Sequence, residues 1–393
     1  MNRKKMIGVA FAGLAMTTSA GPIIHGQERA GEESIRAEAI LARSAVAFAP
    51  GPRPGSPPPS GPQQHRDASP PGDSHLRSEA VRIATDGATI EALLILPNFP
   101  GAHPAVVLIP NTFPDRAASA RDLLRRPAEA YASRGVAALV YDRRGWHGST
   151  GDPAETRFDV MAADALAAVD ALSRRADIDS GRVGVSGYSN SGWTATLAAS
   201  RNQHIAFIVN MVCAPFAPWQ VDLSRVQTQM RGDGFSERDV DRATEYMQVR
   251  FEVGRTGEGW ARLEALRREI ETESWFNHLD HDDTLVGLRR HWQDHLSYDP
   301  ASAWRGLQTP VLVVYAEFDW NFRLPECLAR TRSLLAEAGN SRSTIEVVPK
   351  ADHLLRVATT GGRREFQVAR PLAPGVWDMV LDWVIKRTSA NRP

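Results

Sequence analysis

Short apolar runs alternate with helix-like stretches from about residue 77 onward, and this alternation predicts the fold class. The run AVVLIP, starting at Ala105, is continuously apolar, which is typical of a strand buried on both faces. Helix-like stretches at residues 117–133, 158–175 and 191–200 separate the next strand-like runs, VAALVYD, RVGVSGY and IAFIVNMVC. PVLVVYAE and STIEVVP supply two further strands. The pattern predicts an α/β fold with a mostly parallel central sheet and helices on both faces.

The regular alternation stops between residues 215 and 303. This segment is rich in charged residues at helical spacing, as in SERDVDRATEYMQVRFEV, and it contains or adjoins five of the chain's tryptophans. A connection between a strand and a helix normally takes only a few residues, so a segment of this length predicts its own helical substructure. We expect this helical insertion (residues 215–303) to act as a lid over the site, with most of its tryptophans in ordinary helix packing.

The N-terminal segment predicts export. Residues 1–20 begin with a basic stretch, continue with an apolar run and end in small residues, which is the order of a secretory signal peptide. Its apolar run is too short to span a bilayer, so no stable membrane insertion is expected. Residues 21–76 form an arm and a Pro- and Gly-rich linker, and residues 77–390 form the folded domain. A periplasmic or secreted protein is the expectation.

Charge and cysteine content exclude several classes of function. Lys plus Arg and Asp plus Glu both number 46, so no net field attracts nucleic acid or an acidic membrane. Only two cysteines are present, Cys213 and Cys327, which excludes a disulfide scaffold and a multi-cysteine metal site. Export would permit a disulfide between them, but two free, partly buried thiols are the preferred interpretation. No metal or cofactor is expected, and the sequence does not indicate an oligomeric state.

The stretch GVSGYSNSGW contains the candidate nucleophile, Ser189. Ser189 follows a predicted strand and precedes a predicted helix, where a sharp turn exposes the serine hydroxyl in a nucleophile elbow. Such a turn requires small residues two positions before and after the nucleophile, and Gly187 and Ser191 meet that requirement. Ser186 is the rival, but it would place Tyr188 in a small position and belongs to the strand.

A serine nucleophile requires a base and a group that orients the base. In the order typical of α/β-hydrolases, Asp319 follows the strand VLVVYAE and His353 follows the strand STIEVVP. Both are expected at carboxyl ends of strands, where open α/β sheets place their sites. Glu317 is an alternative acid that is expected still to belong to the strand. Asp352 is expected to point away from the site if His353 faces it.

The oxyanion of the reaction requires two donors. The backbone N–H of Asn190, the residue after the nucleophile, is expected to supply the first. The oxyanion loop (residues 108–116, LIPNTFPDR) is the expected source of the second.

The order of AVVLIPNTFPDR, VYDRRGWHGSTG, RVGVSGYSNSGW, PVLVVYAEFDW and ADHLL resembles the α/β-hydrolase superfamily. It is most similar to secreted bacterial esterase-like members allied to the serine aminopeptidase and prolyl-oligopeptidase type. The resemblance implies Ser189 as nucleophile, Asp319 as acid and His353 as base, and it suggests the backbone of Asn111 or Thr112 as the second oxyanion donor.

The chain departs from this resemblance at three places. Pro110-Asn111 replaces the usual His-Gly, Ser191 replaces the last glycine of the elbow, and Phe113 occupies another usual glycine position. Asparagine tolerates left-handed backbone conformations, so the oxyanion loop can survive the change. Phe113 is expected to line the substrate pocket together with Tyr188 and Trp320.

These residues predict a serine hydrolase that cleaves carboxylic esters through an acyl-enzyme, with a small-molecule ester or short peptide as substrate. Two alternatives stay open. One is a serine peptidase, of aminopeptidase or dipeptidyl-peptidase type, that uses the same triad. The other is a binding protein on a hydrolase scaffold that no longer turns over substrate.

Overall fold

The computed structural model describes residues 75–112, 119–155, 157–279, 283–366 and 368–389. The predicted signal peptide and almost all of the predicted arm and linker lie outside the described residues, as does Phe113. Among the described residues, no helix combines the length and the apolar character needed to cross a membrane.

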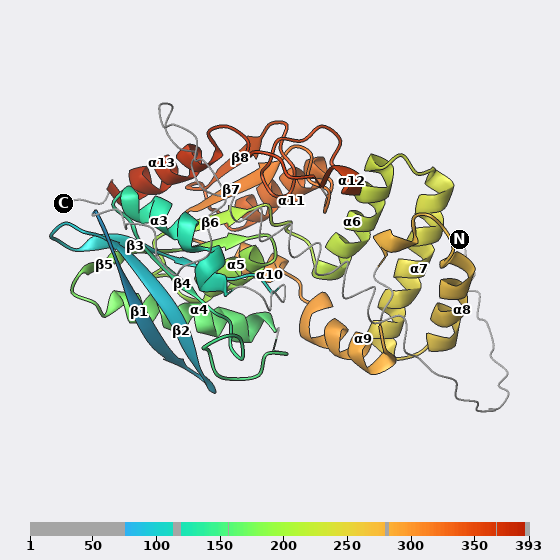
Figure 1. The fold of residues 1–393 in the computed structure, drawn as a ribbon, viewed down its shortest axis with the longest axis horizontal. Helices are drawn as coiled ribbons and strands as arrows, with labels where there is room; N and C mark the ends of the chain where they lie inside the picture. Colours follow the sequence, from blue (N-terminus) through green and yellow to red (C-terminus); the bar gives the residue numbers. More distant parts are fainter. Residues whose placement is uncertain (1–74, 113–118, 156, 280–282, 367, 390–393) are drawn as a thin grey trace, which may run out of the picture.

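An eight-stranded sheet forms the centre of the fold, in the order β1-β2-β4-β3-β5-β6-β7-β8 (Figure 1). The first two strands form an antiparallel hairpin, β2 also pairs antiparallel with β4, and the remaining neighbours are parallel. The predicted mostly parallel sheet is therefore confirmed. The strands are β1 (Leu76–Thr85), β2 (Ala88–Pro97), β3 (His103–Leu108), β4 (Ala137–Tyr141), β5 (Ile178–Tyr188), β6 (Ile208–Met211), β7 (Val311–Ala316) and β8 (Thr344–Val348).

Helices cover both faces of this sheet because successive apolar side chains of its central strands point to opposite faces, which gives two apolar layers. In β4, Leu139 faces one layer and Val140 faces the other, and both are fully buried. One layer includes residues of α4, α5, α10 and α11, and the other includes residues of α3 and α13. The bounds are α2 (Ala120–Leu123), α3 (Arg125–Ser133), α4 (Phe158–Ser173), α5 (Ser191–Arg201), α10 (Ala301–Arg305), α11 (Leu324–Glu337), α12 (Arg363–Phe366) and α13 (Val376–Ser389).

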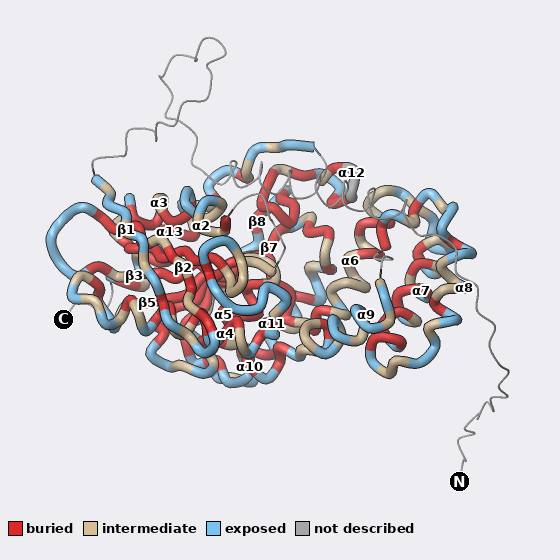
Figure 2. Tube along the Cα trace, turned by 60° about the horizontal axis from the view of Figure 1, so that its bottom comes forward, coloured by how far each residue is buried: buried red, intermediate tan, exposed pale blue. Residues whose placement is uncertain are grey.

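The helical insertion follows β6 and precedes β7, and it has an apolar cluster of its own. Its elements are α6 (Pro218–Gly232), α7 (Glu237–Thr256), α8 (Trp260–Ile270), the 3-10 helix η1 (Phe276–His278), α9 (Leu285–His291) and the π-helix η2 (Trp292–Leu296). Four tryptophans that were expected to take part in helix packing, at positions 219, 260, 275 and 292, pack in or against this cluster. Figure 2 shows buried positions along the strands and a second group inside these helices. That the insertion acts as a lid stays a prediction.

The helical insertion touches the C-terminal part of the domain through two glycines. A Cβ atom on Gly232, the last residue of α6, would lie 2.8 Å from Cα of Gly362. A Cβ atom on Gly362 would lie 2.8 Å from the carbonyl carbon of Gly232 and 2.4 Å from Oδ1 of Asp233. Only glycine fits at either position, because real Cβ atoms do not approach other atoms so closely.

Candidate functional site

Ser189 occupies the turn between β5 and α5, at the carboxyl end of the sheet. Its φ is +54°, a left-handed conformation that is uncommon for a residue other than glycine and that marks a strained functional turn. The turn is tight, because a Cβ atom on Gly187 would lie only 2.4 Å from the carbonyl oxygen of Ser191. The local geometry is therefore that of a nucleophile elbow.

The structure brings the three predicted catalytic residues into one hydrogen-bonded line. Nε2 of His353 lies 2.9 Å from the hydroxyl oxygen of Ser189, and Nδ1 of His353 lies 2.8 Å from Oδ2 of Asp319. Asp319 and His353 are both buried, and Asp319 Oδ1 also accepts a hydrogen bond from the Asn321 N–H at 2.8 Å. In this arrangement the imidazole can take the serine proton while the carboxylate orients the ring.

The rival candidates have other positions. Ser186 is buried inside β5, opposite Leu108 of β3. The expectation that Glu317 belongs to the strand is wrong, because β7 ends one residue earlier, at Ala316. Glu317 is nevertheless not the acid in this geometry, since its carboxylate accepts a hydrogen bond from the Lys350 N–H.

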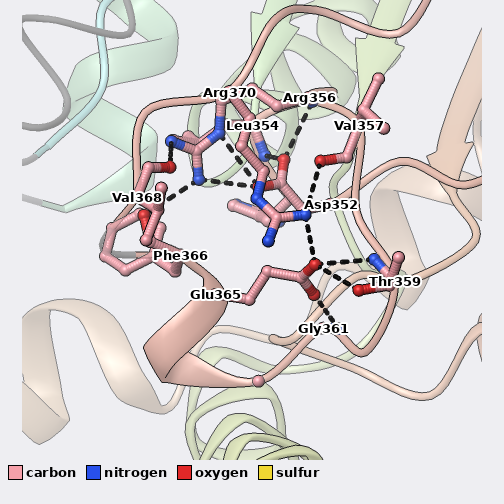
Figure 3. Close-up of polar contacts among 12 residues, drawn as sticks. Asp352, Leu354, Arg356, Val357, Thr359, Gly361, Glu365, Phe366, Val368 and Arg370 are labelled. Atoms are coloured by element: carbon pink, nitrogen blue, oxygen red, sulfur yellow. Dashed lines mark hydrogen bonds and ion pairs between the residues drawn. The ribbon is translucent and has the colours of Figure 1, made fainter.

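The Asp352 carboxylate forms a buried ion pair with Arg356. Two guanidinium nitrogens of Arg356 lie 2.7 and 3.0 Å from Oδ2 of Asp352, and each of the two side chains is 1% exposed. Arg356 also donates to the carbonyl oxygens of Phe366 and Val368 (Figure 3). The loop that carries His353 is thus held together by a charged pair that the sequence did not reveal, because i, i+4 neighbours meet on a helix and Asp352 and Arg356 lie in a turn.

A second polar centre in the same loop is Glu365. Its carboxylate accepts hydrogen bonds from the N–H and hydroxyl groups of Thr359 and Thr360 and from the N–H of Gly361. It also pairs with Arg370 at 2.5 Å (Figure 3). Burial alone would raise the pKa of Glu365, but the hydrogen bonds from Thr359 and Thr360 outweigh it and lower the pKa to about 2.

Side chains connect the oxyanion loop to the elbow. Oδ1 of Asn111 accepts from the Ser191 N–H at 3.3 Å, and Oδ1 of Asn190 accepts from the Thr112 N–H at 3.3 Å. Nδ2 of Asn190 also donates to the Thr112 hydroxyl. Within the described residues, the backbone N–H groups of Asn111 and Asn190 have no acceptor, whereas that of Thr112 is engaged.

The predicted pocket residues lie around His353 as far as they are described. The ring of Trp320 is 5.4 Å from the His353 ring and 4.6 Å from the ring of Phe366. The Tyr188 ring is 6.0 Å from the His353 ring, and its hydroxyl donates to the carbonyl oxygen of His353. Tyr188 therefore helps to hold the loop that carries His353 (the histidine loop), a role that the sequence did not suggest. Contact of Trp320 and Tyr188 with substrate stays a prediction.

Burial affects the ionisable groups near the triad. It raises the pKa of Asp319, an effect opposed by His353 and by the Asn321 N–H. Cys213 and Cys327 are both free and buried, and burial raises the pKa of each thiol. Buried thiols with raised pKa values are poor nucleophiles, so they do not compete with Ser189.

Comparisons with known proteins identify the family and the fold of the chain. Residues 86–337, more than half of the chain, match the X-Pro dipeptidyl-peptidase (S15) family. An esterase from the archaeon Pyrobaculum calidifontis is 16% identical, with 93% of this chain and 94% of that chain covered and a TM-score of 0.50. An esterase from Pyrococcus furiosus is also 16% identical, with 83% of this chain and 97% of that chain covered and a TM-score of 0.50. A search of curated proteins found no match.

The two esterases are too distant in sequence to show more than a shared fold, which is the α/β-hydrolase fold. The length of the family match, together with a Ser, His and Asp in hydrogen-bond contact, decides the family. The chain belongs to the S15 family of serine hydrolases.

Proposed function

We propose that this protein hydrolyses carboxylic esters, with Ser189 as nucleophile, His353 as general base and acid, and Asp319 as the orienting carboxylate. The observation that carries the proposal is the contact of His353 Nε2 with the Ser189 hydroxyl at 2.9 Å, at a residue held in a left-handed turn. His353 takes the serine proton as Ser189 attacks the carbonyl carbon, and returns it to the leaving alcohol. Water then attacks the acyl-enzyme with His353 again as base.

The proposed oxyanion donors are the backbone N–H groups of Asn190 and Asn111. Their lack of a protein acceptor among the described residues leaves both groups available for a carbonyl oxygen. The N–H of Thr112 is the less favoured alternative, because it already donates to the side chain of Asn190. Two such donors stabilise the negative charge that develops on the substrate oxygen.

A peptidase that removes X-Pro dipeptides is the second candidate, and the family match favours it. A dipeptidyl-peptidase has to bind a free ammonium group, for which an available carboxylate is the natural partner. On the loops of Asp319 and His353, however, Asp352 is paired with Arg356 and Glu317 accepts from the backbone of Lys350. Neither of these two carboxylates is therefore available to a substrate ammonium group, and this is the reason for placing the ester first.

Fluorophosphonate labelling tests the proposal. We expect the wild type to be labelled, Ser189→Ala to be unlabelled, and the matched Ser186→Ala to be labelled like the wild type. Absence of label on the wild type would favour the non-catalytic binding protein. Equal labelling of Ser189→Ala would remove Ser189 from its role.

Comparing kcat/KM on short-chain p-nitrophenyl esters and on X-Pro p-nitroanilides then separates the two activities. We expect the esters to be turned over faster, and a preference for X-Pro anilides would instead establish the peptidase. We also propose export, because residues 1–20 have the pattern of a signal peptide. N-terminal sequencing of protein recovered from the periplasm or medium should find the first residues removed.

A further inference from the structure

Arg143 is a half-buried cation without a carboxylate partner in the described part of the chain. The two arginines nearby in the fold are paired: Arg121 lies 2.5 Å from Asp142, and Arg144 lies 2.5 Å from Asp164. Burial lowers the pKa of Arg143, which reflects the cost of removing its charge from water. A partly buried guanidinium that has no carboxylate partner among the described residues is unfavourable for stability, which points to a functional role for Arg143.

The contacts of Arg143 lead to the oxyanion loop. Nη1 of Arg143 donates to the carbonyl oxygen of Thr112 at 3.1 Å, and the guanidinium lies 5.4 Å from the centre of the Trp146 ring. The N–H and hydroxyl groups of Thr112 are bound by the side chain of Asn190. Thr112 is therefore held from two sides, by Arg143 at its carbonyl and by the residue after Ser189 at its other polar groups.

We propose that Arg143 is a positioning residue for the oxyanion loop. By fixing the carbonyl of Thr112 it restricts rotation of the backbone next to Asn111, the proposed second oxyanion donor. An arginine suits this task, because its planar guanidinium is oriented by the Trp146 ring while it donates to the carbonyl. In this loop Asn111 and Thr112 are held in place by hydrogen bonds that involve side chains.

This inference rests on the proposed hydrolytic function, and its test is an effect on kcat rather than on KM. For Arg143→Met we expect kcat on a neutral p-nitrophenyl ester to fall about tenfold or more, with KM changed less than about twofold. Affinity for a boronic acid, which forms a tetrahedral adduct on serine, should fall by a similar factor. Arg143→Lys should recover part of the loss, and methylguanidinium should partly rescue Arg143→Ala.

Arg82→Met is the control for loss of a guanidinium, because the Arg82 side chain is 79% exposed on β1. It should leave kcat and boronate affinity unchanged. If the wild type reacts with fluorophosphonate but Arg143→Met and Arg143→Lys keep the wild-type kcat, the positioning role is wrong and the hydrolase proposal survives. A rise in KM confined to esters with a carboxylate on the acyl chain would also overturn it, because Arg143 would then bind substrate charge. A wild type that does not react would remove both proposals.

Discussion

The hydroxyl of Ser191 is hydrogen-bonded to both polar groups of the Tyr188 backbone. It accepts from the Tyr188 N–H at 2.8 Å and donates to the Tyr188 carbonyl oxygen at 2.9 Å. Ser191 is the residue that replaces the last glycine of the elbow motif, and it is 2% exposed. The replacement therefore contributes two bonds that hold the turn around Ser189, and a glycine could make neither of them.

Restoring the motif with Ser191→Gly should weaken the protein rather than improve it. The change removes the hydroxyl that accepts from the Tyr188 N–H and donates to the Tyr188 carbonyl oxygen, and we expect this loss to cost about 1–3 kcal/mol of unfolding free energy. Urea unfolding and the rate of fluorophosphonate labelling measure the two effects. Ser191→Ala should behave similarly, whereas Ser200→Ala, in the same helix, should change stability by less than about 0.5 kcal/mol. Faster labelling of Ser191→Gly at unchanged stability would contradict this interpretation.

Asp319→Asn should abolish most activity without loss of stability. The amide no longer favours the required imidazole tautomer, so kcat should fall by about 10³–10⁴. Burial raises the pKa of Asp319 in the folded protein above its unfolded value of about 3.9, so folding favours the protonated form. Stability contributed by this group therefore falls as pH rises through the folded pKa, and the neutral amide avoids that loss.

Asp352→Asn is the matched comparison for Asp319→Asn. Asp352 lies one residue before His353 and is paired with Arg356, so its replacement leaves a buried guanidinium with a neutral partner. We expect a loss of about 3–5 kcal/mol, because breaking one side of a buried ion pair is costly. Urea unfolding at pH 7 and pH 8 measures both variants. If Asp319→Asn lowered the free energy of unfolding as much as Asp352→Asn does, the charge on buried Asp319 would not be unfavourable for stability.

Glu365 should make the histidine loop sensitive to acid. Its folded pKa of about 2 lies below the unfolded value of about 4.3, so the group contributes stability above pH 4.3 that is lost as the pH falls toward 2. Glu365→Gln should therefore be less stable than the wild type at pH 7, and the two should converge near pH 2. Urea midpoints at pH 3, 4, 5 and 7 give the curves. Glu346→Gln, at an exposed position of β8, should follow the wild type throughout.

Tyr188→Phe should reduce activity moderately, because it removes the hydroxyl that donates to the His353 carbonyl. One hydrogen bond of about 1 kcal/mol corresponds to roughly a fivefold fall in kcat if all of it is expressed in the transition state. KM for a small ester should change little, because the aromatic ring is kept. Tyr246→Phe, inside the helical insertion, serves as the control and should keep the wild-type kcat. A kcat equal to that of the wild type in Tyr188→Phe would show that His353 is held without this bond.

The sheet could be predicted from local patterns because each buried strand is a continuous apolar run. The runs at Ala105 and Val311 lie within or next to observed strands, and the turn near Gly87 joins β1 and β2. The order of Ser189, Asp319 and His353 was equally visible, since carboxyl ends of parallel strands meet at one edge of a sheet.

Contacts between residues distant in sequence could not be predicted in the same way. The pairs Asn190 with Thr112 and Ser191 with Asn111 join positions about eighty residues apart, and no local period specifies them. The chain passes from β2 to β3, yet β2 pairs with β4, and the apolar pattern of neither β2 nor β4 specifies this neighbour. The hydrogen bond from Arg143 to the Thr112 carbonyl oxygen likewise joins two segments that lie far apart in the sequence.

Because Gly232 and Gly362 approach each other closely, α6 and the loop around Gly362 can change only together during evolution. A side chain at either position would push α6 away from the residues that follow His353. The helical insertion therefore cannot be exchanged with that of a relative as an independent module. A chimera would have to take residues 215–303 and the loop around Gly362 from the same parent, or keep glycine on both sides of the junction.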